Sequence, residues 1–174
     1  ITSLVFWVSL VLSVVSPVQA KVITVEPFVG KLEASTSNKR ILLIKEDEKK
    51  VKFRLSDIEK LTMYELDMPA IWNDESGKYQ GVLLGDILDL AEISKAKNIK
   101  LVALDGYVIE INLEEWKNHC LFIATRYKSE LIAIEKKGPT RVLLPCTIKG
   151  IAPDYEETTT SEWIWNLKEI HVAN

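Results

Sequence analysis

The residues best suited to chemistry in this chain are basic side chains that cluster between positions 126 and 149. The cluster consists of Arg126, Lys128, Lys136, Lys137, Arg141 and Lys149. A planar guanidinium recognises phosphate through paired hydrogen bonds, so Arg126 and Arg141 are the first candidates for binding an anion, with Lys137 beside them. Short strands joined by tight turns would bring several of these charges to one rim. The alternative interpretation is that they only keep the surface of a sheet soluble.

Aromatic residues indicate which kind of anion would suit such a rim. Trp72 lies in a segment rich in turn-forming residues, and Tyr107 begins a strand directly after a turn. Flat rings at the edge of a cleft suit a flat heterocycle such as a pterin. Trp163 and Trp165 stand two positions apart on one strand and are expected to share a face. For Trp165 we expect a core position, because tryptophans at alternating strand positions are usually buried.

Other kinds of site have little support in the sequence. The two histidines, His119 and His171, have no His or Cys partner at helical ligand spacing. The chain contains no Gly-x-Ser-x-Gly nucleophile motif and no glycine-rich phosphate loop. Anion binding is therefore the chemistry that the residues favour, and no metal site is expected.

Two cysteines, Cys120 and Cys146, are open to two interpretations. In an oxidising compartment they would close a disulfide loop that contributes roughly 3 kcal/mol to stability. Alternatively, they are two separate buried thiols that act as small apolar residues. The sequence does not decide between these interpretations.

Composition limits the class of protein. The chain has 174 residues, of which 47% are apolar and 27% charged, as is typical of a globular domain. Its net charge of −3 and scattered lysines argue against a nucleic-acid partner. Residues 1–20 are apolar, end in Val18-Gln19-Ala20 and have the character of a secretory signal peptide, which leaves 21–174 as one domain.

The alternative for this leader is a membrane anchor. Its apolar core of about a dozen residues is shorter than the ~20 residues that span a bilayer as a helix. We therefore expect a periplasmic or secreted protein with no stable membrane insertion after the signal is cleaved.

Apolar patterning predicts an α+β fold with a mixed, largely antiparallel sheet and a few short helices. Ser56 and Glu59 form a capping box that predicts a short helix, and helical spacing predicts a second one over 82–93. A third short helix is expected around 113–119. Asp105-Gly106 predicts a hairpin turn. The predicted strands span 22–28, 39–46, 51–55, 99–104, 107–111, 121–127, 131–135, 141–145 and 163–172.

Four strings in the second half of the chain carry a family resemblance. They are YQGVLLGDIL at 79–88, LDGYVIEI at 104–111, KKGPTRVLLP at 136–145 and WIWNLKEIHV at 163–172. In that order and spacing they resemble the molybdopterin-binding domain of sulfite-oxidase-type oxidoreductases, and the resemblance implies that fold. It also implies a cofactor-binding role for Arg141, which stands where the family has an arginine near the cofactor. Ile164 stands where the family has a lysine.

One departure from the family changes the expected function. Those enzymes hold molybdenum through a cysteine thiolate ahead of the first string, and residues 61–78 contain no Cys. The chain therefore resembles small exported proteins that consist of this domain alone and are described as pterin-binding. We expect a non-catalytic binding protein for a small planar or anionic ligand, with a pterin as the implied ligand and no molybdenum.

Two alternatives remain open. One is a molybdenum-dependent oxidoreductase in which Cys146 supplies an atypical thiolate. The other is a periplasmic accessory or sensory protein that docks onto a protein partner through an exposed sheet edge.

Overall fold

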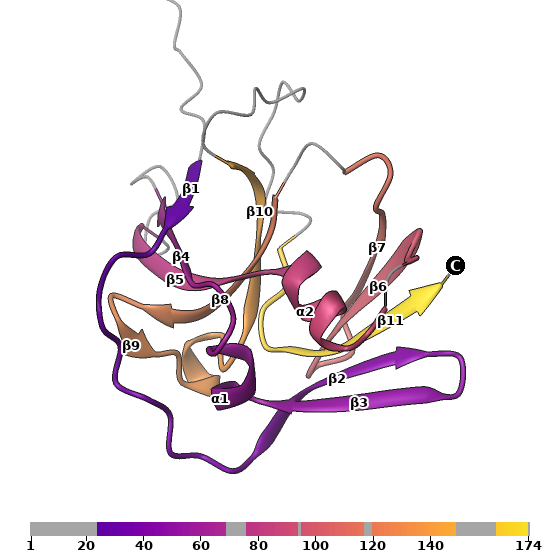
Figure 1. Ribbon diagram of the computed structural model, residues 1–174, viewed down its shortest axis with the longest axis horizontal. Helices are drawn as coiled ribbons and strands as arrows, with labels where there is room; N and C mark the ends of the chain where they lie inside the picture. Colours follow the sequence, from indigo (N-terminus) through magenta and orange to yellow (C-terminus); the bar gives the residue numbers. More distant parts are fainter. Residues whose placement is uncertain (1–23, 69–75, 94, 117–119, 149–162, 174) are drawn as a thin grey trace, which may run out of the picture.

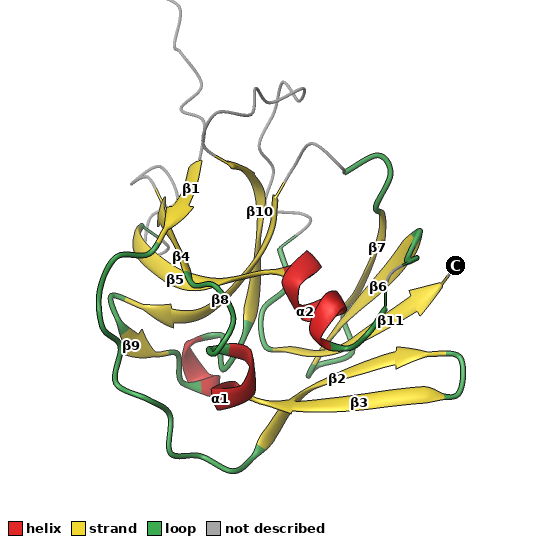
Figure 2. Cartoon of the chain, in the orientation of Figure 1, coloured by secondary structure: helices red, strands yellow, loops and turns green. Residues whose placement is uncertain are grey.

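Strands dominate the structure. The computed structural model describes residues 24–68, 76–93, 95–116, 120–148 and 163–173, with the backbone alone for 144–148. Within these ranges the strands form two sheets, whose arrangement is shown in Figure 1. Figure 2 shows how little of the described chain is helical. The predicted strand-rich fold with largely antiparallel pairing and few helices is confirmed, but the strands form two sheets where one was predicted. The finer family fold stays a prediction.

The first sheet closes on itself, and we call it the closed sheet. Its strand order is β10-β1-β4-β5-β8-β9, and an additional pairing of β10 with β8 completes the ring. Only the pairing of β1 with β10 is parallel among its ladders. The strands are β1 (Thr24–Pro27), β4 (Tyr64–Met68), β5 (Gly77–Leu83), β8 (Cys120–Tyr127), β9 (Glu130–Leu131) and β10 (Arg141–Ile148).

A glycine allows two strands of the closed sheet to approach closely. A Cβ atom at Gly81 in β5 would lie 2.1 Å from the carbonyl oxygen of Ile123 in β8, so only glycine fits there. This contact helps to set how tightly β5 packs on β8.

The second sheet is open and has the order β3-β2-β11-β6-β7. Strand β11 pairs parallel to β2, and the other ladders are antiparallel. Alternation sends residues such as Ile44 and Leu101 inward, while Lys45 and Lys100 face outward. Its strands are β2 (Arg40–Glu46), β3 (Lys49–Arg54), β6 (Asn98–Ala103), β7 (Val108–Asn112) and β11 (Leu167–Ala173).

Both sheets contribute to one hydrophobic core. Phe122 and Leu66 of the closed sheet belong to the same buried cluster as Ile44 and Ile170 of the open sheet. Helix α2 (Leu84–Leu90) directly continues β5 and packs against β5 and β8. Helix α1 (Leu55–Ile58) directly follows β3. In Figure 1, α1 lies below the closed sheet, beside the start of β2 and the end of β3.

Several predicted element boundaries are wrong. The helix predicted over 82–93 begins only at Leu84, because β5 continues through Val82 and Leu83 as its buried pairing with β8 requires. The strand predicted over 131–135 is reduced to the end of β9, followed by the 3-10 helix η2 (Ile134–Lys136). The described part of the predicted helix over 113–119 is a turn.

The capping box also differs from the prediction. Helix α1 begins after Arg54, whose backbone N–H and side chain both donate to the carboxylate of Asp57. Ser56 is therefore not the N-cap. Glu59 does not take part in the N-terminal capping box, and its carboxylate pairs with Arg126 instead.

The cysteines are resolved in favour of the disulfide. Cys120 is disulfide-bonded, and the ladder between β8 and β10 places Cys146, the one other cysteine of the chain, opposite it. The interpretation as two separate thiols is wrong.

None of the helices in the described ranges has the length and the apolar character needed to cross a membrane. The predicted leader, 1–20, lies outside the described residues.

Candidate functional site

A pocket at one end of β5 and β8 is lined by four of the six basic residues that the sequence places between positions 126 and 149. It has a volume of about 480 Å³, and we call it the basic pocket. Four basic side chains and one carboxylate line it. The lining residues are Tyr79, Tyr127, Lys128, Glu130, Leu131, Ile132, Lys136, Lys137 and Arg141.

The inner wall is built from two tyrosines and an arginine. Tyr79 in β5 stands opposite Tyr127 in β8, and their ring centroids lie 4.9 Å apart at an interplanar angle of 43°. Arg141, the first residue of β10, donates from Nη1 to the hydroxyl of Tyr79 at 3.2 Å. Its guanidinium carbon lies 5.2 Å from the centroid of the Tyr79 ring. Tyr79 is only 2% exposed, so the accessible aromatic surface of this wall comes mainly from Tyr127.

Burial governs the charges at this wall. Arg141 is only 3% exposed, and burial lowers the pKa of its guanidinium, with the nearby Tyr79 acting in the opposite direction. Burial likewise raises the pKa of the Tyr79 hydroxyl, so that it remains a neutral hydrogen-bonding group. A cation destabilised by lost hydration is one that a bound anion would stabilise.

The rim carries lysines on unusual backbone. Lys128, in the turn between β8 and β9, has φ 52°, and Lys137, which follows η2, has φ 70°. Glycine adopts this left-handed conformation readily, whereas residues with a side chain, apart from Asn and Asp, rarely do. Lys128 Nζ lies 4.9 Å from the Tyr127 ring centroid, and Lys137 Nζ lies 4.0 Å from that of Trp165. Residues held in sparsely populated backbone conformations are enriched at functional sites.

A close approach fixes the segment behind the rim. A Cβ atom at Gly138 would lie 2.0 Å from the carbonyl oxygen of Ile132, so the chain can pass this point only as glycine. The Gly138 N–H donates to the carbonyl of Ala133 at 2.9 Å. Lys137 is therefore held next to a residue with little freedom to move.

The structure brings together two of the five site residues predicted from sequence. Arg141 and Lys137 line the basic pocket, joined by Lys128 and Lys136 from the same cluster. Tyr107 is 50% exposed at the turn between β6 and β7 and is not among the residues that line the pocket. Trp72 lies outside the described residues, as does Lys149.

Arg126 is the predicted site residue whose surroundings differ most from expectation. It is 3% exposed, and it donates from Nε and Nη2 to the two carboxylate oxygens of Glu59, each at 2.8 Å. Hydrogen bonding to Glu59 raises the pKa of Arg126. Nη2 also donates to the backbone carbonyl of Glu33, and Nη1 to that of Ser129 at 3.3 Å. Glu59 neutralises the charge of Arg126 inside the protein, so Arg126 stabilises the fold and is not part of the rim of the basic pocket.

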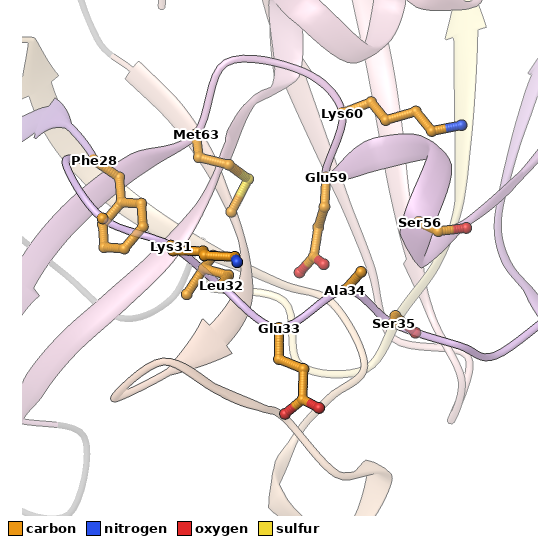
Figure 3. Close-up of a pocket in the computed structure, with 11 residues that line it drawn as sticks. Phe28, Lys31, Leu32, Glu33, Ala34, Ser35, Ser56, Glu59, Lys60 and Met63 are labelled. Atoms are coloured by element: carbon orange, nitrogen blue, oxygen red, sulfur yellow. The ribbon is translucent and has the colours of Figure 1, made fainter.

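Glu59 also lines a second pocket, which Figure 3 shows. Its volume is about 430 Å³, and its walls come from the loop after β1 and from α1 and the residues after it. The carboxylate of Glu59 points between Met63 and Ala34, whereas Lys60 extends away from it (Figure 3). Because Glu59 is bound by Arg126 and also accepts from Thr125 Oγ1 at 2.9 Å, this carboxylate already has partners.

The prediction for Trp165 is wrong. It is 47% exposed, whereas Trp163 is 5% exposed. The two do not share a strand face, because β11 begins only at Leu167 and Asn166 adopts φ 51° just before it. Sequence reasoning also missed Tyr79 and Tyr127. Tyr127 ends a predicted strand, 121–127, but no predicted strand included Tyr79, and the pairing of the two depends on the ladder between β5 and β8.

Comparison with known proteins adds no family assignment. No protein-family model matches the chain, and no curated protein matches it. The arguments below therefore rest on the basic pocket itself. Among the described residues there is also no group of three or more His, Cys, Asp or Glu side chains placed to hold a metal ion.

Proposed function

We propose that this protein binds a small, flat, anionic ligand in the basic pocket, without catalysing its conversion. A pterin that carries a negative group is the ligand we favour. The observation that carries the proposal is the lining, in which Lys128, Lys136, Lys137 and Arg141 face a single carboxylate, Glu130, beside two tyrosine rings.

Electrostatics supports an anion in this pocket. Four cations around one cavity repel one another, and their mutual repulsion falls when an anion enters. Arg141 adds directional hydrogen bonding, since a guanidinium presents a planar set of donors that suits a carboxylate or phosphate. The anionic group of the ligand would lie towards Arg141 and the lysines of the rim.

Shape supports a flat ligand. The volume of about 480 Å³ falls within the range usual for small-molecule sites. Tyr127, which is partly exposed, offers ring surface that is well suited to a planar heterocycle, and the buried Tyr79 supports it from behind. A pterin ring with a carboxylate satisfies both requirements, and the sequence resemblance favours the same ligand class.

The oxidoreductase alternative loses its main support. It requires a thiolate at Cys146, but Cys120 is disulfide-bonded and the chain has no third cysteine. A sulfur atom in a disulfide is not a thiolate ligand.

Titration of the purified protein with pterin-6-carboxylate, followed by tryptophan fluorescence and calorimetry, tests the proposal. We expect saturable binding that weakens as salt is raised, and weaker binding of pterin without the carboxylate. Absence of saturable binding of pterin-6-carboxylate at low salt, at ligand concentrations up to the millimolar range, would falsify it.

A further inference from the structure

We propose that Trp165 is a positioning residue, which holds the ammonium group of Lys137 at the rim of the basic pocket and thereby strengthens anion binding. This inference rests on the function proposed above. Trp165 is not itself among the residues that line the pocket, so its effect would pass through Lys137.

Aromatic rings support three of the cations in the basic pocket. Among the described residues, the cation–π contacts are those of Lys128 with Tyr127, Arg141 with Tyr79, and Lys137 with Trp165. The last is the shortest, at 4.0 Å from nitrogen to ring centroid. Tyr79 and Tyr127 are also walls of the pocket, whereas Trp165 supports its cation from outside.

A ring is a useful support for a cation that has to bind an anion. Its face attracts an ammonium group through the quadrupole of the π system, yet the ring carries no net charge. An indole therefore restricts the position of an ammonium group without placing a negative charge beside it. A carboxylate that restricts a cation does place one there, as Glu59 does beside Arg126.

The backbone fixes where the indole lies. Asn166, the next residue, donates its backbone N–H to the Lys137 carbonyl at 3.0 Å. Its side-chain amide donates to the carbonyl of Ile134 at 2.8 Å and to that of Gly138. These bonds attach the chain beside Trp165 to the segment that carries Lys137, so the two side chains are held together by more than their own contact.

Exposure indicates that packing is not the reason for an indole here. Trp165 is 47% exposed, so nearly half of a large apolar side chain remains in water. An isolated exposed residue of this kind contributes little to the core. Its ring contacts the Lys137 ammonium, and Lys137 has a backbone φ of 70°, where glycine would be the easier residue.

A double-mutant cycle tests the inference, with pterin-6-carboxylate as the probe. We expect Trp165→Ala to weaken binding about fivefold, the effect of losing one partly exposed cation–π contact. Lys137→Met should weaken binding by at least as much. Adding Trp165→Ala to Lys137→Met should then cause no further loss, because the indole would have no ammonium left to position. Trp165→Phe should restore most of the affinity.

Controls separate positioning from a general effect on the fold. Leu104→Ala removes another half-exposed apolar side chain outside the pocket lining and should leave affinity unchanged. The urea midpoint of Trp165→Ala should match that of the unmodified protein. If the unmodified protein binds the probe but Trp165→Ala binds equally well, or weakens binding equally with and without Lys137, the inference is wrong while the proposed function stands. If the unmodified protein does not bind the probe, both fail.

Discussion

Arg126 and Arg141 are buried to the same degree, but the pKa values of their guanidinium groups are shifted in opposite directions. Each is 3% exposed, and they lie on the neighbouring strands β8 and β10. The pKa of Arg126 is raised, first because of its hydrogen bonds to Glu59, whereas the pKa of Arg141 is lowered, first because of burial. Because the two side chains are equally buried, the hydrogen bonds to Glu59 explain why the pKa of Arg126 is raised, and they make Arg126 part of the fold.

The two regions also differ in what they connect. Arg126 links β8 to Glu59 just after α1 and to the carbonyl of Glu33, in the loop that leads from the closed sheet to the open sheet. Arg141 contacts Tyr79 on the wall of a pocket that opens to solvent. Breaking the first region should therefore change stability, and breaking the second should change binding.

Removing the counterion of Arg126 should have the largest effect. Glu59→Gln leaves a buried guanidinium without its charge partner, so we expect the free energy of unfolding to fall by about 3–5 kcal/mol. Urea unfolding at neutral pH measures the change. The matched control is Glu110→Gln, which breaks the exposed pair with Lys100 and should cost less than about 1 kcal/mol.

A compensating variant makes this test stricter. Replacing both partners, Arg126→Met with Glu59→Leu, removes the unpaired charge and should recover most of the lost stability. A loss for Glu59→Gln no larger than that of the control would contradict a structural role for this pair.

Arg141→Met should show the opposite pattern. We expect the affinity for pterin-6-carboxylate to fall about tenfold or more, as for the loss of a hydrogen bond to a charged group. The loss of stability should be smaller than for Glu59→Gln, because Met retains an apolar side chain of similar length and the hydroxyl left behind on Tyr79 is neutral. Calorimetric titration and urea unfolding of the same sample measure both quantities. Arg40→Met, at an exposed arginine of the open sheet, should change neither; a loss of stability without a loss of affinity would remove Arg141 from the site.

The sequence predicted the strands better than the site, for a physical reason. Runs such as 39–46 and 121–127 are apolar or alternating over their own length, so local pattern identifies β2 and β8. Strand β4 was missed although Tyr64–Met68 alternates between apolar and polar residues, because the alternation lasts for only 5 residues before a turn-rich segment. Strand β5 was missed as well, because its last apolar residues were assigned to the helix predicted over 82–93. The strand predicted over 131–135 failed because most of its apolar residues are exposed in η2 or the residues beside it.

The site was harder to predict because it depends on distant pairs. A cluster of cations is visible in the sequence, and Lys137 with Arg141 does line one pocket. Nothing local reveals that Glu59, 67 positions away, takes Arg126 out of that cluster. Nor does local pattern reveal that Tyr79 and Tyr127 will meet, because their pairing is set by the closure of a sheet.

The backbone at the rim allows a test in which stability and binding change in opposite directions. Lys128 has φ 52°, a conformation that glycine adopts without steric cost. Lys128→Gly should therefore raise the free energy of unfolding by about 0.5 kcal/mol, even after the loss of the contact with Tyr127, while it weakens binding of pterin-6-carboxylate. Asp47→Gly, at φ 47° in the turn between β2 and β3, is the matched control and should leave binding unchanged. Equal affinity for both variants would show that Lys128 does not bind the ligand.

A partly buried ion pair completes the comparison with Glu59. Glu169 on β11 accepts hydrogen bonds from Lys45 and from His171, and these, Lys45 first, lower its pKa to about 2. A carboxylate whose pKa is lower in the folded state stabilises the fold above its ordinary pKa, and this contribution is lost as the pH falls from about 4.5 towards 2. Because Lys45 is 31% exposed, solvent screening limits the contribution to less than about 1 kcal/mol.

Glu169→Gln isolates this contribution. The difference in unfolding free energy between the unmodified protein and Glu169→Gln should be largest near pH 6 and should shrink towards zero near pH 2, as urea unfolding across that range would show. If the difference persists unchanged at pH 2, the carboxylate contributes through packing instead of charge. A small, acid-sensitive value here beside a large value for Glu59→Gln would show that burial of the cation makes the Arg126 pair the stronger one. The side chains of Glu59 and Glu169 are 10% and 13% exposed, whereas those of Arg126 and Lys45 are 3% and 31% exposed.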